Sequence, residues 1–141
     1  MKKILVTGSE GFIGSHLTEH LLSKKYEVTA LVYYNSFESN GWLNNIEPKL
    51  LNKLNIVYGD LRDKNFLLKI SKKHDAIMHL AALIAIPYSY SAPESYVQTN
   101  VLGTFNILEA AKANNIKKII ITSTSEIYGR SKKFPIKEDF P

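Results

Sequence analysis

Three glycines placed three residues apart, directly after a short apolar run, constrain the fold of this chain more than any other feature. The apolar run is Ile4–Val6, and the residues that follow bring apolar side chains back at every fourth position, as in a helix. This order predicts a buried strand, then a tight turn, then a helix. The glycines are Gly8, Gly11 and Gly14.

The spacing of these glycines is one residue longer in its first gap than the G-x-G-x-x-G pattern of dinucleotide-binding proteins. The mechanics are the same, because the first glycine permits a tight turn, the second lets the backbone approach a pyrophosphate, and the third lets the helix pack against the strand. The N-terminus of the helix supplies unpaired N–H donors. Glycines that only form a turn are the alternative, and their place between a strand and a helix favours a phosphate-binding loop.

The rest of the chain repeats the alternation of strand and helix. Because strands that alternate with helices form right-handed crossovers, we expect one α/β domain, residues 1–141, with a doubly wound parallel sheet. Residues 35–52 depart from the pattern and predict a long connection with a short amphipathic turn. The predicted strands are 4–6, 27–33, 55–58, 76–80 and 118–122; the predicted helices follow Gly11 and span 61–71 and 93–115, the last with an apolar stripe of Val97, Val101, Phe105 and Leu108.

The composition excludes several classes of protein. The chain has 141 residues and no cysteine, so disulfides, a thiolate nucleophile and cysteine-ligated metals are ruled out, and we expect a cytoplasmic protein. Its longest apolar run, Leu80–Ile86, is far shorter than the roughly 20 residues of a membrane-spanning helix, and no export signal is readable. His16–His20 matches the H-x-x-E-H spacing of some zinc peptidases, but helical geometry places His20 near the apolar stripe, so we expect no metal site.

The net charge of +5 does not point to nucleic acid. The lysines fall in pairs, and three pairs coincide with predicted helix ends, where cations complement the helix dipole. A basic binding patch is the alternative. We expect these pairs at the edge of the sheet opposite the strand carboxyl ends, away from any ligand, and we expect no nucleic-acid partner. The pairs are Lys24-Lys25, Lys72-Lys73 and Lys117-Lys118.

Five motifs in a fixed order resemble the extended short-chain dehydrogenase/reductase family, in particular its nucleotide-sugar epimerases and 4,6-dehydratases. The resemblance covers the whole chain and implies a Rossmann-like domain that binds NAD(P) and acts on a nucleotide-sugar. The short apolar runs separately lead us to expect no membrane partner. The motifs are Thr7-Gly8-x-x-Gly11-Phe12-Ile13-Gly14, Gly59-Asp60-Leu61-Arg62-Asp63, His79-Leu80-Ala81-Ala82, Asn100 within Thr99–Thr104, and Thr122–Gly129.

The same resemblance assigns cofactor contacts. Asp60 would accept a hydrogen bond from the adenine amino group while Leu61 packs on the ring, although Asp60 could instead cap a helix. Residues 80–82 would line the ribose and the nicotinamide, since they follow a strand whose carboxyl end meets the glycine loop. The full set of expected cofactor-binding residues is Gly8, Gly11, Phe12, Ile13, Gly14, Tyr33, Asp60, Leu61, Leu80, Ala81, Ala82 and Asn100.

The choice between NAD and NADP depends on the end of the second predicted strand. An acidic residue that accepts from the ribose 2′-hydroxyl normally stands about 20 residues beyond the glycines, and Val32 occupies that place. The missing carboxylate favours NADP slightly. No arginine follows, however, only Tyr33 and further polar residues.

The triplet Thr124, Ser125 and Glu126 carries the expected chemistry. By resemblance, Thr124 hydrogen-bonds the sugar hydroxyl that is oxidised, and Glu126 is the base that removes the C5 proton once C4 is a ketone, so that the C6 hydroxyl leaves. Some dehydratases carry Asp at the place of Ser125, and the Thr-Ser-Glu order is more similar to the GDP-mannose type. A solvated Glu126 after a strand is the alternative, and many epimerases lack the glutamate.

The Tyr-x-x-x-Lys pair of the family has no credible match. Tyr128 and Lys132 fit by letter, but Gly129 argues against the helix on which the pair should lie. We therefore expect an N-terminal part of a dehydratase, truncated after the fifth strand and without its substrate domain. A 4-epimerase and a non-catalytic dinucleotide-binding module are the alternatives, and a homodimer remains open for the full-length enzyme.

Overall fold

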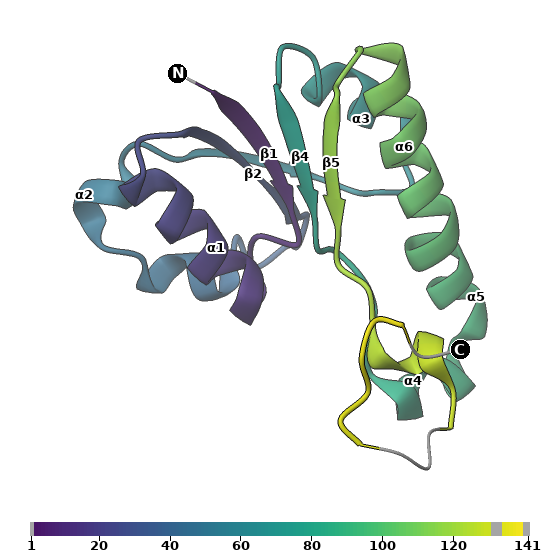
Figure 1. Ribbon diagram of the computed structural model, residues 1–141. Coiled ribbons are helices and arrows are strands. Elements are labelled where there is room, and N and C mark those ends of the chain that lie inside the picture. The colour runs from purple at the N-terminus through teal and green to yellow at the C-terminus, as the bar shows by residue number, and fades with distance from the viewer. Residues whose placement is uncertain (1, 131–133, 140–141) are drawn as a thin grey trace.

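The computed structural model describes residues 2–130 and 134–139 and contains the predicted parallel sheet (Figure 1). Its five strands are all parallel and run in the order β3-β2-β1-β4-β5. This order is the strand arrangement of a Rossmann-like fold, with the switch point between β1 and β4. The strands are β1 Lys3–Thr7, β2 Glu27–Tyr33, β3 Asn55–Gly59, β4 Ala76–His79 and β5 Lys118–Ile121.

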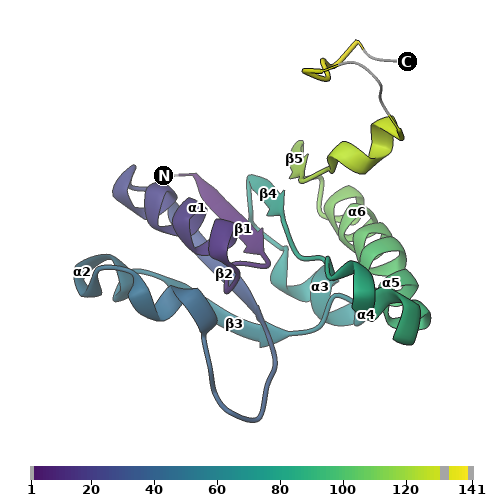
Figure 2. The same ribbon diagram turned by 90° about the horizontal axis from the view of Figure 1, so that it is seen from below.

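Helices cover both faces of the sheet, which confirms the doubly wound architecture. Figure 2 shows α1 and α2 on one side and α3 and α6 on the other. Alternate residues of β1 serve the two cores, because Ile4 and Val6 pack toward α1 and Leu5 packs toward α3 and α6. The helices are α1 Phe12–Ser23, α2 Pro48–Leu51, α3 Lys64–Ile70, α4 Ile86–Ser91, α5 Pro93–Tyr96 and α6 Thr104–Ala113.

The connection between β2 and β3 contains the short amphipathic turn that the sequence predicts. A 3₁₀ helix, η1 Gly41–Asn45, precedes α2, and its Leu43 is fully buried with Ile46 against β2. The expected break in regular structure over 35–52 is therefore confirmed, and its apolar residues form a small separate core.

The helix predicted over 93–115 is present but not uniform. A π-helical stretch, η2 Val97–Gly103, separates α5 from α6. The predicted stripe points outward, since Val97, Val101 and Phe105 are all more than half exposed. The helix instead turns one isoleucine and three small residues inward, and the small residues let it approach α3 closely. The inward residues are Gly103, Ile107, Ala110 and Ala111.

Two helix predictions need correction. Helix α3 begins at Lys64 rather than at residue 61, because Asp63 caps it by accepting a hydrogen bond from Phe66 N. The predicted apolar stripe of helix α1 is buried only in part: Leu21 lies in the core with Leu17 packed against it, but Ile13 is 64% exposed, and His20, expected near the stripe, is exposed as well. Among the described residues no helix combines the length and apolarity needed to cross a bilayer.

Candidate functional site

The glycine loop joins β1 to α1 and is held by close backbone contacts. Gly8 has φ of +67°, and a Cβ at this residue would lie 2.6 Å from Ala81 N, in the segment after β4. A Cβ on Gly14 would lie 2.0 Å from Gly8 O, so the third glycine lets the helix pack on the loop. Gly11 differs, because its nearest neighbour would be Gly8 O at 3.4 Å, an ordinary contact. Gly8 and Gly14 are therefore needed by the fold, and Gly11 leaves one side of the loop open.

The N-terminus of α1 lacks an intramolecular cap. Gly11 is its N-cap residue and offers no side chain, and the first turn contains no acidic residue. The first residues of the helix, Phe12 and Ile13, are 61% and 64% exposed. The first N–H groups of a helix have no intrahelical partner and lie at the positive end of its dipole, so this end of α1 suits an anion such as a diphosphate.

Buried hydroxyl groups fasten the loop to the sheet, and the sequence analysis did not identify them. Ser9 is fully buried, and its Oγ donates to Leu31 O at 3.0 Å. Thr7 Oγ1 accepts from Ala81 N at 3.2 Å. The small hydroxyl residues beside the glycines are the sequence signal that could have predicted these contacts, because a buried serine or threonine needs a hydrogen-bond partner.

His79, at the end of β4, lies in a directed chain of hydrogen bonds. The Thr104 hydroxyl donates to Asn100 O at 2.7 Å and therefore accepts from His79 Nε2 at 3.0 Å. His79 Nδ1 then accepts from the Thr7 hydroxyl at 2.7 Å. Burial lowers the pKa of His79 to about 4, so the ring is neutral near pH 7 with its proton on Nε2.

Asn100 is committed to a loop rather than facing a ligand. Its Oδ1 accepts from Leu83 N at 2.8 Å and its Nδ2 donates to Leu83 O at 2.9 Å. The residue lies in the π-helical stretch, which is a common feature of functional sites. In this structure Asn100 thus shapes the segment after Ala82, and the expected direct contact with a cofactor stays a prediction.

At the end of β2 the structure brings together Tyr33 and two acidic residues. Tyr33 N donates to Glu10 Oε1 at 3.0 Å, and the Tyr33 hydroxyl lies 3.5 Å from Arg62 Nη2. Arg62 Nε and its backbone N donate to Asp60. These hydrogen bonds hold the pKa of Asp60 below its ordinary value. Asp60 is not the cap of α3, because Asp63 has that role.

The remaining expected cofactor residues differ in accessibility. Leu61 is only 6% exposed and packs in the core, where Gly103 leaves room for it, so little of its side chain could lie on a ring. Leu80 and Ala81 are partly buried after β4, and Ala82 is exposed. Residues 80–82 therefore lie beside Gly8 at the switch point, as the sequence predicts, and present mostly backbone there.

Thr124, Ser125 and Glu126 are exposed and follow β5. Thr124 caps a 3₁₀ turn, η3 Ser125–Tyr128, by accepting from Glu126 N at 3.2 Å. Figure 2 shows this segment running outward beyond β5, away from α1, so the described residues do not bring the triplet against the glycine loop. Tyr128 is the last residue of this 3₁₀ helix and does not lie on an α-helix, and Lys132 lies outside the described residues.

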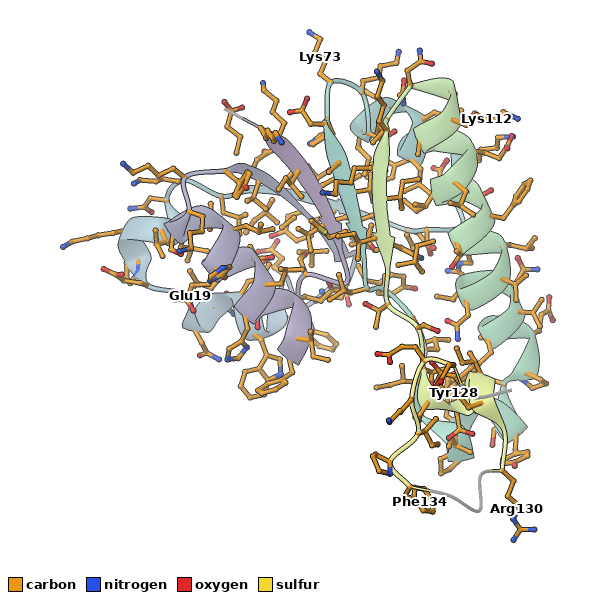
Figure 3. All side chains as sticks on the ribbon, in the orientation of Figure 1. Glu19, Lys73, Lys112, Tyr128, Arg130 and Phe134 are labelled. Carbon is orange, nitrogen blue, oxygen red and sulfur yellow. The ribbon has the colours of Figure 1, made fainter. Side chains whose placement is uncertain are left out.

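The paired lysines lie at the other edge of the sheet. Figure 3 shows Lys73 and Lys112 at the end of the molecule opposite Tyr128. Lys72 and Lys73 line a cavity of about 330 Å³ together with Lys3. This confirms the expected position of the Lys72-Lys73 pair. Within 2–130 and 134–139, no three His, Asp or Glu side chains are grouped so as to hold a metal ion.

Comparison with known proteins gives consistent matches. A family model described as GDP-mannose 4,6 dehydratase matches residues 5–141. UDP-glucose 4-epimerase of Pisum sativum is 36% identical over 148 aligned positions, which cover 99% of this chain and 41% of that protein.

Solved structures superpose on the chain over nearly all of its length. UDP-N-acetylglucosamine 4-epimerase from Methanobrevibacter ruminantium M1, in complex with UDP-N-acetylmuramic acid, is 38% identical with a TM-score of 0.84 and is matched over 98% of this chain and 43% of that one. UDP-glucose 4-epimerase from Bifidobacterium longum, in complex with NAD+ and UDP, is 31% identical with a TM-score of 0.87, over 99% and 42%. This chain thus spans less than half the length of the proteins it resembles.

Proposed function

Because this chain belongs to the GDP-mannose 4,6 dehydratase family, among NAD-dependent epimerases and dehydratases, we propose that it binds the dinucleotide cofactor of an enzyme that modifies nucleotide-sugars. The observation that carries the proposal is the uncapped N-terminus of α1 at the switch point of the sheet. Ligands of open parallel sheets bind at that point, and phosphates bind at helix N-termini.

The local geometry fits a diphosphate. Gly11 leaves the loop open where a side chain would intrude, and the first turn of α1 holds no carboxylate to repel an anion. Gly8 and Ala81 bring the two segments that flank the switch point into contact. The backbone N–H groups of Phe12 and Ile13 would hold the phosphates, and residues 80–82 would line the nicotinamide half.

The chain's own groups would keep the cofactor in one position. The hydrogen bonds from Thr7 to His79 and to Ala81 N fix the backbone after β4. The Asp60 carboxylate, partly exposed beyond β3, would accept from the adenine amino group while Arg62 holds it in place. When bound, NAD would supply an acceptor for the hydride that leaves a sugar carbon as the hydroxyl on that carbon is oxidised.

The reaction that we favour is 4,6-dehydration. Glu126 supports this proposal, because an exposed carboxylate two residues after Thr124 suits the removal of a C5 proton from a 4-keto sugar. Thr124 would bind the hydroxyl at C4, and Ser125 would bind an adjacent sugar oxygen. The second candidate is 4-epimerisation, which is favoured by the names of the Pisum sativum relative and of the two solved structures reported above, since these three are 4-epimerases.

One experiment distinguishes the two reactions. It uses the longest natural polypeptide that contains this sequence. The enzyme is incubated with a UDP- or GDP-hexose in D₂O, and the sugar is examined by NMR. Dehydration exchanges the C5 proton for deuterium and yields a 4-keto-6-deoxy sugar. Epimerisation leaves C5 and C6 unchanged and inverts C4. A 4-epimer without deuterium at C5 would overturn the dehydratase proposal and leave cofactor binding intact.

A further inference from the structure

We propose that Glu10, in the glycine loop, selects NAD over NADP by placing an uncompensated negative charge beside the carboxyl end of β2. This inference rests on the proposed function, because it concerns the ribose of the dinucleotide bound there. In folds of this kind the adenosine ribose lies near the end of the second strand, and NADP carries its additional phosphate on that ribose. A carboxylate at that point disfavours NADP and leaves NAD unaffected.

The strand itself cannot supply the charge. Val32 stands where an acidic residue is expected, and it is fully buried. Leu43 and Ile46, from the connection after β2, pack in the same cluster. A carboxylate at residue 32 would therefore be enclosed by apolar side chains, at a high desolvation cost. The acidic group at this edge has to come from another segment.

Glu10 reaches the strand end from the glycine loop. Its Oε1 accepts from Tyr33 N at 3.0 Å, and Tyr33 is the last residue of β2. Its backbone O accepts from Trp42 N at 2.9 Å. Gly41 permits this contact, because a Cβ there would lie 2.5 Å from Glu10 O. The loop and the connection thus hold the Glu10 carboxylate at the end of the strand.

Little compensates the charge of this carboxylate. Glu10 Oε2 is covered by protein atoms and has no hydrogen-bond partner among the described residues. The ion pairs among the described residues join Lys3 to Glu27, at the start of β2, and Arg62 to Asp60, and neither includes Glu10. A single backbone N–H leaves most of the negative charge to act on its surroundings.

The nearby arginine does not offset this effect. Arg62 Nη2 lies 3.5 Å from the Tyr33 hydroxyl, close enough for the guanidinium to serve a phosphate beside β2. However, its Nε donates to both oxygens of Asp60 at 3.0 Å, and Nη2 pairs with the same carboxylate. The pair is close to neutral as a unit. A phosphate on the ribose would therefore meet the charge of Glu10 while Arg62 stays engaged with Asp60.

The test compares the affinities of NAD and NADP for the full chain by isothermal titration calorimetry. Glu10→Gln removes the charge and keeps an oxygen that accepts from Tyr33 N. We expect it to strengthen NADP binding by about fivefold or more, from the Coulomb energy of unit charges several ångströms apart in a wet site, and to leave NAD affinity nearly unchanged. Glu109→Gln on α6 is the matched control, with the same change of net charge and no expected change in the ratio.

Salt provides a second measurement on the wild-type chain, independent of how any variant folds. Raising NaCl from about 0.05 to about 0.5 M shortens the Debye length, which screens the charge of Glu10. The ratio of NAD affinity to NADP affinity should therefore fall. Three results would each overturn this inference alone. They are equal affinities for NAD and NADP at low salt, a preference for NAD that salt does not reduce, and an unchanged ratio of the two affinities in folded Glu10→Gln. Failure of the folded wild-type chain to bind either dinucleotide would instead overturn the proposed function.

Discussion

Thr7 Oγ1 donates a hydrogen bond of 2.7 Å to His79 Nδ1 across the ends of the two central strands. The same hydroxyl accepts from Ala81 N, and the other side of the His79 ring donates to Thr104. The neutral imidazole of His79 thus connects β1, β4 and α6 directly beneath the glycine loop. Its neutrality has a measurable consequence.

Acidification should destabilise the chain through His79. Burial lowers its pKa to about 4, below the ordinary value of 6.5, so the unfolded state binds more protons between these values and stability falls as pH drops through that window. At pH 5 we expect a loss of about 2 kcal/mol in the free energy of unfolding relative to pH 7.5 from this group. Urea unfolding at the two pH values measures the loss.

NMR distinguishes His79 from His74, whose pKa is also lowered by burial. In the wild-type chain the His79 ring resonances should not titrate between pH 7.5 and about pH 5, as expected for a neutral ring with a proton on Nε2. Titration of His79 near its ordinary pKa would contradict the hydrogen-bond chain.

Gly14→Ala should prevent normal packing of α1. The new methyl would lie 2.0 Å from Gly8 O and 2.8 Å from Ser9 Cα, and both are backbone atoms that cannot turn away. We expect destabilisation of about 3 kcal/mol or more, as for severe overpacking. Thermal unfolding measures the effect, and an unchanged midpoint would contradict the described loop geometry.

Asn100→Leu should loosen the segment after β4. The substitution leaves both Leu83 N and Leu83 O without the partners that they have in Asn100. We expect a cost of about 1–3 kcal/mol and faster hydrogen exchange at the Leu83 amide. Asn100→Asp is the matched variant, since it keeps the acceptor for Leu83 N and should protect that amide better. Equal exchange in wild type and Asn100→Leu would contradict the assigned role.

Glu126→Gln should separate the steps of the proposed dehydration in the catalytically complete enzyme. If Glu126 removes the C5 proton, the variant should lose C5 deuterium exchange by about a hundredfold or more while C4 oxidation, seen as NADH absorbance, persists. Glu109→Gln is the control. Loss of both steps in equal measure, or of neither, would contradict a role for Glu126 as the base.

Local patterns were sufficient to predict the sheet. Residues 27–33 form β2 as expected, and the other strands agree within one residue at either end. The glycine loop was also predictable, because φ at Gly8 and the close approach at Gly14 are requirements of the local backbone. These features depend on residues close together in sequence.

The orientation of the long helix was not predictable in this way. Its strongest apolar periodicity, through Val97, Val101 and Phe105, faces outward. The inward face is made by smaller residues such as Gly103 and Ala110, which permit close packing on α3. Periodicity identifies a helix but does not say which of two apolar faces a neighbouring element covers.

Contacts between residues far apart in the sequence could likewise not be predicted. The pairing of Thr7 with His79 spans 72 residues, and that of Glu10 with Tyr33 spans 23. The slight preference for NADP followed from Val32 alone, since nothing in the local sequence indicated that Glu10 would lie at the same strand end. A charge that reaches a site from another segment is visible only in the folded chain.

The central claim is that the open side of the glycine loop and the N-terminus of α1 hold a dinucleotide. Calorimetric titration of NAD into wild-type and Gly11→Ala chains tests it most directly, because the new methyl meets no atom closer than 3.4 Å within the protein and therefore should leave the fold intact. We expect heat of binding for wild type and at least a tenfold weaker affinity, roughly 1.4 kcal/mol, for Gly11→Ala with unchanged circular dichroism. Equal affinity of the two folded chains would contradict the claim.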